Sequence, residues 1–518
     1  MKKTLLLVAL FTICFAGIGF ASNPPIIPLP QSHSMAKGSF KIKDQLTIYF
    51  DDSFANDAYY LQKQIFDIKG ITASFGSDKN SADIILEQKS QKNKQEGAYT
   101  LAISESKISI SSENDLGIFN GIASLLQLIT IAESEIDCWT IEDYPLHGWR
   151  GFMLDESRHF FGKEKVKQIL DYMAFYKLNR FHWHLTDDPG WRIEIKKYPH
   201  LAYTGGIGNM TYPNDPPQYY TQEEVKEIVR YAAERKIEVI PEIDMPGHAR
   251  AANRAYPEYS GGGSKSHPEF TFDPANEDTY QYLTDILKEI NVLFPSEMIH
   301  LGGDEVHFGN EQWKHNDKIK ELMEKEGMKD LAEVEKYFMV RMADSLYAMN
   351  NTFLAWDEMA EISLPTDKTI MFWWRHDRKD QLQKALEKNY PVILCPRIPF
   401  YIDFVQDEDH TTGRRWGKEY SPLELVYEFN TKNLVDSKYD SQVLGLQANL
   451  WAETIQTKQR VDYLTFPRIS AFAEAAWGQN NDYDDYLNRL ESHLPIYRND
   501  NVFFFNPFDH SENPEPKK

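Results

Sequence analysis

The stretch MIHLGGDEVH, residues 298–307, joins a short apolar run to two glycines and two adjacent acids. The run from Met298 to Leu301 is typical of a buried strand, and the two glycines let the backbone bend and leave room close to it. Because Asp304 and Glu305 follow at the end of that strand, desolvation and mutual repulsion should raise the pKa of one of them. A protonated acid beside an ionised carboxylate can protonate a leaving group and stabilise positive charge. In an open loop, the same pair would be only a solvated bend, and the alternative interpretation of the pair is a helix cap or an ion pair.

Length and composition limit the class of protein. The chain has 518 residues, which suits a large barrel with a smaller partner domain. Its 78 acidic residues outnumber the 56 Lys and Arg and give a formal charge of −22. This charge argues against nucleic acid and anionic membrane surfaces as partners. The 11 Trp residues could form flat surfaces for sugar rings or belong to the core.

Residues 1–21 have the pattern of a secretory signal peptide, with two lysines before an apolar run from Leu5 to Phe20. Small residues near Ala21 predict cleavage there, which would leave an exported protein, periplasmic or extracellular, with no membrane span. After cleavage, Cys138 and Cys395 remain. They could pair, but two distant cysteines do not make a disulfide scaffold.

Residues 24–144 have a mixed pattern that predicts a small α+β domain with a packing role. Helical periodicity covers 57–68 and 116–132, and strand patterns cover 46–50, 82–86, 99–103 and 107–110. The last two strand patterns predict a hairpin, because turn residues separate them.

From residue 146 to 478, short apolar runs alternate with helical stretches, which is typical of parallel βα units. Strands are predicted over 149–155, 180–185, 237–244, 298–301, 352–356, 369–374, 392–395 and 443–450. Helices are predicted over 163–177, 221–235, 278–293, 331–350 and 379–388. Eight strands with intervening helices predict an α/β chain with a (β/α)8 TIM barrel. Residues 479–518 should add a helix over 483–494 and a tail that packs on the barrel, with the last ten residues frayed.

The ends of the eight predicted strands all carry acids, bases or large aromatic residues. Active sites of such barrels lie where the strands end. The residues at this rim are Arg158, Asp187, Asp188, Asp244, His248, Asp304, Glu305, Trp356, Asp357, Glu358, Trp373, Trp374, Tyr401, Asp403, Trp451 and Glu453. Packing alone does not explain such residues at all eight ends.

Six segments at these ends resemble those of the family 20 glycoside hydrolases, which are exo-acting β-N-acetylhexosaminidases. They are DESR (155–158), HWHLTDD (182–188), PEIDMPGH (241–248), HLGGDE (300–305), WDE (356–358) and NLWAE (449–453). The likeness covers nearly the whole barrel, and the small N-terminal domain fits the family layout. It implies a retaining hydrolase for terminal β-linked GlcNAc or GalNAc of glycans, without a metal or other cofactor.

The resemblance also implies the course of the reaction. The substrate's own acetamido oxygen attacks the anomeric carbon, and water then opens the oxazolinium intermediate with net retention. Glu305 would be the general acid and then the base. Asp304 would orient the acetamido group and stabilise its charge, and Tyr401 would donate a hydrogen bond to its oxygen.

The remaining residue roles are implied in the same way. Trp374 is preferred to Trp373 because a basic residue follows it, as in the family, and Trp373 is expected in the core. The aromatic walls would be Trp356, Trp374 and Trp451. Arg158 and Glu453 would hold the outer hydroxyls, Asp187 and His248 would form a relay to Glu305, and Asp403 would lie beside the acetamido group or the outer hydroxyls.

Two alternative functions remain at this stage. A metal-dependent amidohydrolase-like enzyme could use His182, His184, His248, His300 and Asp304 as zinc ligands. One of His182 and His184 is expected to face the barrel interior. This alternative lacks a bridging lysine and does not explain the aromatic rim. A non-catalytic carbohydrate-binding protein would keep the tryptophans but would have no need for Asp304 with Glu305. The sequence leaves open a homodimer, the natural glycan and its linkage.

Overall fold

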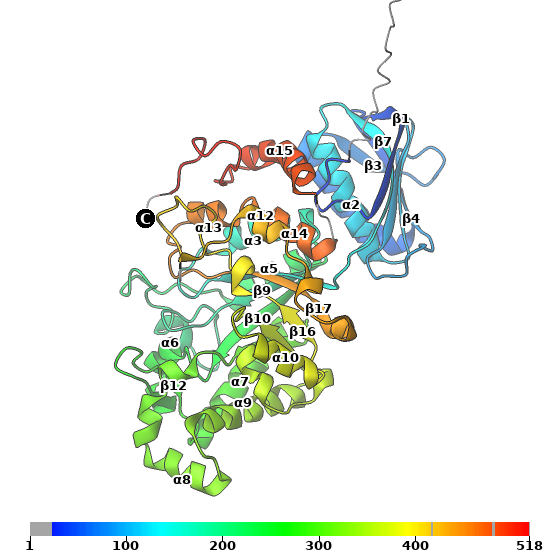
Figure 1. The fold of residues 1–518 in the computed structure, drawn as a ribbon. Coiled ribbons are helices and arrows are strands. Elements are labelled where there is room, and N and C mark those ends of the chain that lie inside the picture. The colour runs from blue at the N-terminus through cyan, green and yellow to red at the C-terminus, as the bar shows by residue number, and fades with distance from the viewer. Residues whose placement is uncertain (1–22, 416–417, 479–481, 517–518) are drawn as a thin grey trace, which may run out of the picture.

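A computed structural model describes residues 23–415, 418–478 and 482–516. The expected signal peptide lies outside these residues. Figure 1 shows an N-terminal domain, coloured blue to cyan, beside a barrel domain coloured green to orange. The described part of the chain contains no helix that is long and apolar enough to cross a membrane.

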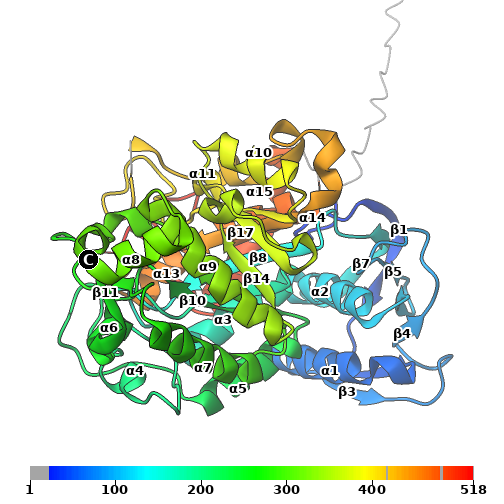
Figure 2. The ribbon, with the colours of Figure 1, turned by 90° about the horizontal axis from the view of Figure 1, so that it is seen from below.

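The N-terminal domain is a seven-stranded mixed sheet in the order β1-β7-β5-β6-β4-β2-β3, with two long helices. Its strands are β1 (Ser32–Lys41), β2 (Gln45–Phe50), β3 (Thr72–Phe75), β4 (Ile84–Gln88), β5 (Tyr99–Ile103), β6 (Ile108–Ser112) and β7 (Glu135–Asp143), and its helices are α1 (Ala55–Lys69) and α2 (Asp115–Ile131). The two helices run side by side between the sheet and the barrel (Figure 2). The predicted helices, strands and hairpin are present, whereas β1, β3 and β7 were not predicted.

The second domain is a closed barrel of eight strands, and every neighbouring pair is parallel. The strands are β8 (Trp149–Asp155), β9 (Arg180–His184), β10 (Glu238–Met245), β13 (Met298–Gly302), β14 (Thr352–Trp356), β15 (Thr369–Trp373), β16 (Val392–Leu394) and β17 (Val443–Leu450). The last strand, β17, pairs with β8 and closes the ring. The predicted TIM barrel is therefore confirmed, and all eight predicted strands occur at their predicted places.

Long helices surround the barrel: α3 (Lys163–Phe175), α5 (Gln222–Ala233), α7 (Glu277–Leu293), α9 (Leu331–Ala348), α10 (Lys379–Glu387) and α14 (Arg468–Trp477). Shorter elements lie in the connections: α4 (His200–Tyr203), α6 (Arg250–Ala255), β11 (Ser260–Gly262), β12 (Thr271–Phe272), α8 (Asp317–Glu326), α11 (Arg397–Phe400), α12 (Leu423–Tyr427) and α13 (Lys458–Thr465). Helix α5 begins at a capping box, in which the Thr221 hydroxyl and the Glu224 carboxylate each accept the other residue's backbone N–H. The main apolar core fills the layer between the strands and these helices.

The C-terminal part packs more tightly than the sequence predicted. Helix α15 (Tyr483–Asn499) lies beside α2 (Figure 1), and Phe504 and Phe505 are buried. The expectation of a frayed tail is wrong for the described residues, because the Glu515 carboxylate accepts hydrogen bonds from the backbone of Thr411 and Thr412. Cys138 in β7 and Cys395 after β16 are both buried and free, so they do not pair.

The N-terminal domain contacts the end of the barrel at which the strands begin. Lys177, which precedes β9, lies 3.1 Å from Asp143 of β7, and both side chains are fully buried. The same carboxylate accepts hydrogen bonds from the Trp477 indole at 2.9 Å and the Tyr99 hydroxyl at 2.7 Å. The rim that carries the predicted site residues lies at the other end of the barrel, where the strands end. The N-terminal domain therefore supports the barrel and does not line this rim.

Replacement of Asp143 tests this junction. Asp143→Ala would leave the Lys177 ammonium buried without its counter-ion, a change that typically costs about 3–5 kcal/mol. We expect a clear fall in the urea concentration at which the protein unfolds. The adjacent Glu142 pairs with Lys92 at 3.2 Å in an exposed ion pair, so Glu142→Ala should change the midpoint little. Equal midpoints for the two variants would contradict the role given to Asp143.

Candidate active site

The turn after β13 presents two carboxylates to the mouth of the barrel. Gly302 and Gly303 adopt φ values of +69° and +84°. A Cβ atom at Gly302 would lie 1.8 Å from the Asp244 carboxylate oxygen, so only glycine fits there. Glu305 also has a left-handed φ of +54°, which is unfavourable for a residue with a side chain. Such strain persists where surrounding contacts enforce it, and it is common at active sites.

A pocket opens beside this turn. Its lining consists of Arg158, Asp304, Glu305, Trp356, Trp374, Tyr401, Arg414, Trp451 and Glu453. All except Arg414 were predicted from the sequence. The other three predicted residues, Asp187, His248 and Asp403, are buried close behind the lining.

Aromatic side chains form one side of the pocket. The Trp374 and Tyr401 rings stack with centroids 6.0 Å apart, and the Trp356 and Trp451 rings are 5.8 Å apart. Trp374 is held by its indole N–H, which donates to the Glu358 carboxylate at 3.1 Å. Trp373 points into the core, as expected, and is 2% exposed. The sixth strand thus gives one tryptophan to the pocket and one to the core.

Arg158 and Asp187 form the charged side. The Arg158 guanidinium lies 2.7 Å from Asp187, 3.3 Å from Asp155 and 4.0 Å from Glu453. It also covers the Trp451 ring at 4.9 Å. Asp187 faces two further cationic partners, His184 Nε2 at 2.9 Å and His248 Nδ1 at 3.1 Å. Arg158 is therefore held in one orientation at the edge of the pocket.

His248 connects Asp187 to the acid pair. Its Nε2 atom lies 3.7 Å from Asp304 Oδ2 and 3.8 Å from Glu305 Oε2. Burial opposes the charged form, but Asp187 and the other nearby carboxylates hold the pKa of His248 well above its usual range. His248 also has a left-handed φ, of +51°. A cationic imidazole in this position stabilises negative charge on either acid.

Asp304 has a strongly perturbed titration. Burial is the main cause that raises the pKa of Asp304 to about 7, with further repulsion from Glu305 and Glu358, while His248 acts in the opposite direction. The expectation that one acid of the pair has a raised pKa is thus met at Asp304. A neighbouring buried carboxyl, Asp244, has its pKa raised well above its usual range by burial and by Asp304.

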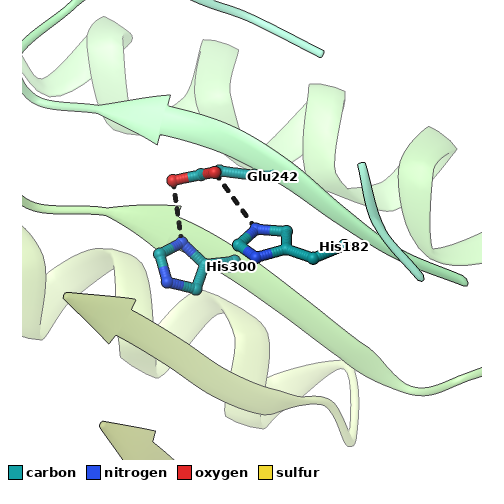
Figure 3. Close-up of side chains that lie close together, drawn as sticks. All are labelled: His182, Glu242 and His300. Atoms are coloured by element: carbon teal, nitrogen blue, oxygen red, sulfur yellow. Dashed lines mark ion pairs between the residues drawn. The ribbon is translucent and has the colours of Figure 1, made fainter. Parts of the chain in front are cut away.

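Glu242 lies at the centre of the barrel, beneath the pocket. Figure 3 shows its carboxylate between His182 and His300, at 3.1 and 2.9 Å. His184 Nδ1 lies 2.5 Å from the same carboxylate, and the Trp356 indole N–H donates to it at 3.0 Å. Burial opposes ionisation, but the three histidines hold the pKa of Glu242 well below its usual range. Glu242 therefore fixes the orientation of a pocket wall.

The expectation that only one of His182 and His184 faces the interior is wrong. Side chains two residues apart share one face of a strand, and both rings contact Glu242. His182, Glu242 and His300 are close enough together to be considered for a metal ion, as are Asp244, His248 and Asp304. However, an indole N–H cannot ligate a metal, and Trp356 and His184 also use the Glu242 carboxylate. The central group therefore fits a hydrogen-bond network better than a zinc site.

Two residues of the candidate site were not identified from the sequence. Glu242 is a charged residue inside a predicted buried strand, two residues before Asp244, and such a residue signals an interior ion pair. Arg414 lies on the loop after the seventh strand, where neither periodicity nor spacing to a strand predicts its position.

Comparisons with known proteins agree on one family. The model of "Glycosyl hydrolase family 20, catalytic domain" matches residues 147–480, and that of "Glycosyl hydrolase family 20, domain 2" matches residues 23–144. A β-hexosaminidase of Porphyromonas gingivalis is 34% identical over 90% of this chain, which spans 62% of that protein. A β-hexosaminidase of Vibrio furnissii is 32% identical over 88% of this chain and 76% of that protein.

Solved structures show the same relationship. An exo-β-N-acetylglucosaminidase from Vibrio harveyi, solved in complex with N-acetylglucosamine, superposes with a TM-score of 0.87. It is 32% identical, and the match covers 94% of this chain and 80% of that one. A β-N-acetylhexosaminidase from Bacteroides fragilis gives a TM-score of 0.81 at 29% identity, over 92% of this chain and 96% of that one.

The raised pKa of Asp304 predicts a pH-dependent stability. In the unfolded chain an aspartate titrates near 4, so the folded state binds a proton more tightly at this residue. That contribution to stability is complete below about pH 4 and is lost as the pH rises through about 7. Asn at this position does not titrate. The melting temperature of Asp304→Asn relative to the parent protein should therefore increase between pH 5 and pH 8. A difference that is constant over this range would contradict the assignment.

Proposed function

The chain belongs to glycosyl hydrolase family 20, and on that premise we propose that it is a retaining, exo-acting β-N-acetylhexosaminidase. It removes terminal, non-reducing β-linked GlcNAc or GalNAc from glycans or glycoconjugates. The observation that carries this proposal is the position of Asp304 and Glu305 beside a pocket walled by three tryptophans. The carboxylates supply acid–base chemistry, and the aromatic walls fit a sugar ring with an acetamido group.

The proposed reaction needs no nucleophile from the protein. The acetamido carbonyl oxygen of the substrate attacks C1, while Glu305 donates its proton to the glycosidic oxygen, and the C1–O bond to the leaving group breaks. The cyclic oxazolinium then reacts with water at C1, and Glu305 takes the water proton. Holding the attacking oxygen close to C1 can supply an effective molarity of about 10⁵ M or more. The stacked Trp374 and Tyr401 rings support this role by narrowing the pocket.

Asp304 and Tyr401 would act on the acetamido group. Asp304 accepts a hydrogen bond from its N–H and stabilises the positive charge that develops on the oxazolinium ring. The Tyr401 hydroxyl donates to the carbonyl oxygen and directs it toward C1. Both residues line the pocket.

The charged end of the pocket supports the exo mode of action. Arg158 and Glu453 lie there, 4.0 Å apart, and can bind the hydroxyls of the terminal sugar. Behind them, Asp187 and His248 would set the orientation and charge environment of Glu305.

We also propose that the protein is exported, which the basic start and apolar run of residues 1–21 support.

The first test compares two aryl glycosides with the purified protein. One is the aryl 2-acetamido-2-deoxy-β-glucoside, and the other is the β-glucoside that carries a hydroxyl in place of the acetamido group. We expect fast release from the first and almost none from the second, because the attacking group is absent from the second. Similar release from both would indicate a nucleophile on the protein, with Asp304 the first candidate. Loss of activity with a chelator would favour the metalloenzyme.

Glu305→Gln tests the proton donor. The amide cannot donate a proton to the glycosidic oxygen, and general acid–base catalysis typically contributes about 10²–10⁴-fold. We expect kcat for the acetamido substrate to fall by that order, while binding of N-acetylglucosamine is retained. Glu311→Gln, at an exposed glutamate in the same loop, is the matched control. Normal turnover by the Glu305 variant would show that another group donates the proton.

A further inference from the structure

A second guanidinium, that of Arg414, lies in the pocket. Its Nη2 atom is 2.6 Å from Glu453 Oε1, and its Nε atom is 3.1 Å from Asp403 Oδ2. Arg414 is 8% exposed and lines the pocket together with Arg158. Glu453 therefore lies between two guanidinium groups. This arrangement places two sets of N–H donors around one carboxylate at the end of the pocket.

The carboxylates beside Arg414 retain free capacity for hydrogen bonds. Among the described residues, the buried Glu453 Oε2 and Asp403 Oδ1 atoms have no hydrogen-bond partner. Buried polar atoms of this kind are costly unless they are paired. Sugar hydroxyls both donate and accept, so neighbouring hydroxyls can satisfy these carboxylate oxygens and the guanidinium together. The chemistry at this end of the pocket thus fits the hydroxyl groups of the terminal sugar that are far from the scissile bond.

Arg414 reaches the pocket from a loop that is fixed by a distant segment. The loop, residues 406–415, has few contacts along its own backbone near the pocket: Arg414 N–H donates to Asp403 O, and Val405 N–H donates to Arg414 O. At its outer turn, the Glu515 carboxylate accepts from Thr411 N at 2.7 Å and Thr412 N at 2.8 Å. Glu515 thus binds the turn through two backbone N–H groups and through the Thr411 hydroxyl, which donates to Oε2 at 2.9 Å.

Arg460 holds Glu515 in this place. Its Nη2 atom lies 3.1 Å from Glu515 Oε1, and its Nη1 atom donates to the Pro516 carbonyl at 3.2 Å. Arg460 belongs to α13 of the barrel domain and is 2% exposed. The barrel domain therefore holds the segment around Glu515, which binds the outer turn of the loop, while Gln406 and His410 of the loop bind Tyr463 of α13 directly.

From these contacts we infer that Arg414 is a specificity-determining residue for the outer hydroxyls of the terminal sugar, and that Glu515 is the positioning residue that keeps it in the pocket. The inference rests on the proposed function and deepens it. Because the outer hydroxyls take no part in bond breaking, these contacts stabilise the bound substrate and the transition state equally. Their loss should therefore raise KM and leave kcat nearly unchanged.

The experiment compares Arg414→Ala, Glu515→Ala and the double variant. It measures the Kd of N-acetylglucosamine by calorimetry, together with kcat and KM for the aryl acetamido substrate. We expect Arg414→Ala to weaken binding about tenfold or more, the size of one charge-assisted hydrogen bond. Glu515→Ala should weaken it less. The double variant should match Arg414→Ala, because Glu515 acts only through Arg414.

Glu512→Ala is the matched control. Glu512 belongs to the same segment, but it binds Arg498 and Asn506 and does not contact the loop. This variant should keep the parent Kd. Arg414→Lys retains the charge without the planar fork and should recover only part of the affinity. Melting temperatures of all variants identify any that fail to fold, and hydrogen exchange of residues 407–415 should increase in Glu515→Ala but not in Glu512→Ala.

The outcomes separate this inference from the proposed function. If the parent binds and hydrolyses the acetamido sugar but Arg414→Ala has the parent Kd and KM, the inference is wrong and the proposed function stands. If the effects of Glu515→Ala and Arg414→Ala multiply in the double variant, Glu515 does not act through Arg414. If the parent neither binds nor hydrolyses the sugar, both proposals fail.

Discussion

The need to pair buried charges governs the functional end of this barrel. Asp187 is 2% exposed and lies against three cationic groups, those of Arg158, His184 and His248. His184 in turn bridges Asp187 to Glu242 inside the barrel. A buried charge that loses its partner destabilises a fold by several kcal/mol, so each of these side chains is confined to one place. Two residues of the pocket lining are fixed in the same way, because Asp187 binds Arg158 and Glu242 accepts a hydrogen bond from the Trp356 indole.

The fold could be predicted largely because the barrel strands are short apolar runs that alternate with helical stretches. The N-terminal domain was predicted less completely, for local reasons. Strand β1 is mostly exposed and polar, and β3 is a short edge strand. Strand β7 alternates between buried and exposed residues, which was a usable signal. Helix α15 was expected to end at Leu494. It continues to Asn499, since Pro495 removes one backbone hydrogen bond while Ile496 and Tyr497 pack in the interior.

The candidate site was predictable where its residues directly follow a strand. The closed barrel brings all eight strand ends to one rim, so sequence position alone places Arg158, Asp304 and Trp451 together. Arg414 follows no strand, and its position depends on contacts between its loop and Glu515, about a hundred positions further along. No local pattern encodes a contact of that kind. The central position of Glu242 could not be predicted either, because its four nitrogen partners come from three other strands of the barrel.

The titration of Asp304 connects the electrostatics of the pocket with the proposed chemistry. Burial is the main cause that raises the pKa of Asp304 to about 7, and repulsion from Glu305 and Glu358 adds to it, so the neutral form is favoured below that pH. The role proposed for this residue requires its ionised form. A positive charge that develops on the acetamido group within a few ångströms lowers the pKa of a buried carboxyl, so it favours the ionised form of Asp304 in the transition state. The interaction is then stronger in the transition state than with the neutral substrate, which is the condition for an interaction to accelerate a reaction. His248, whose Nε2 atom lies 3.7 Å from Asp304, favours the carboxylate both before and after this charge develops.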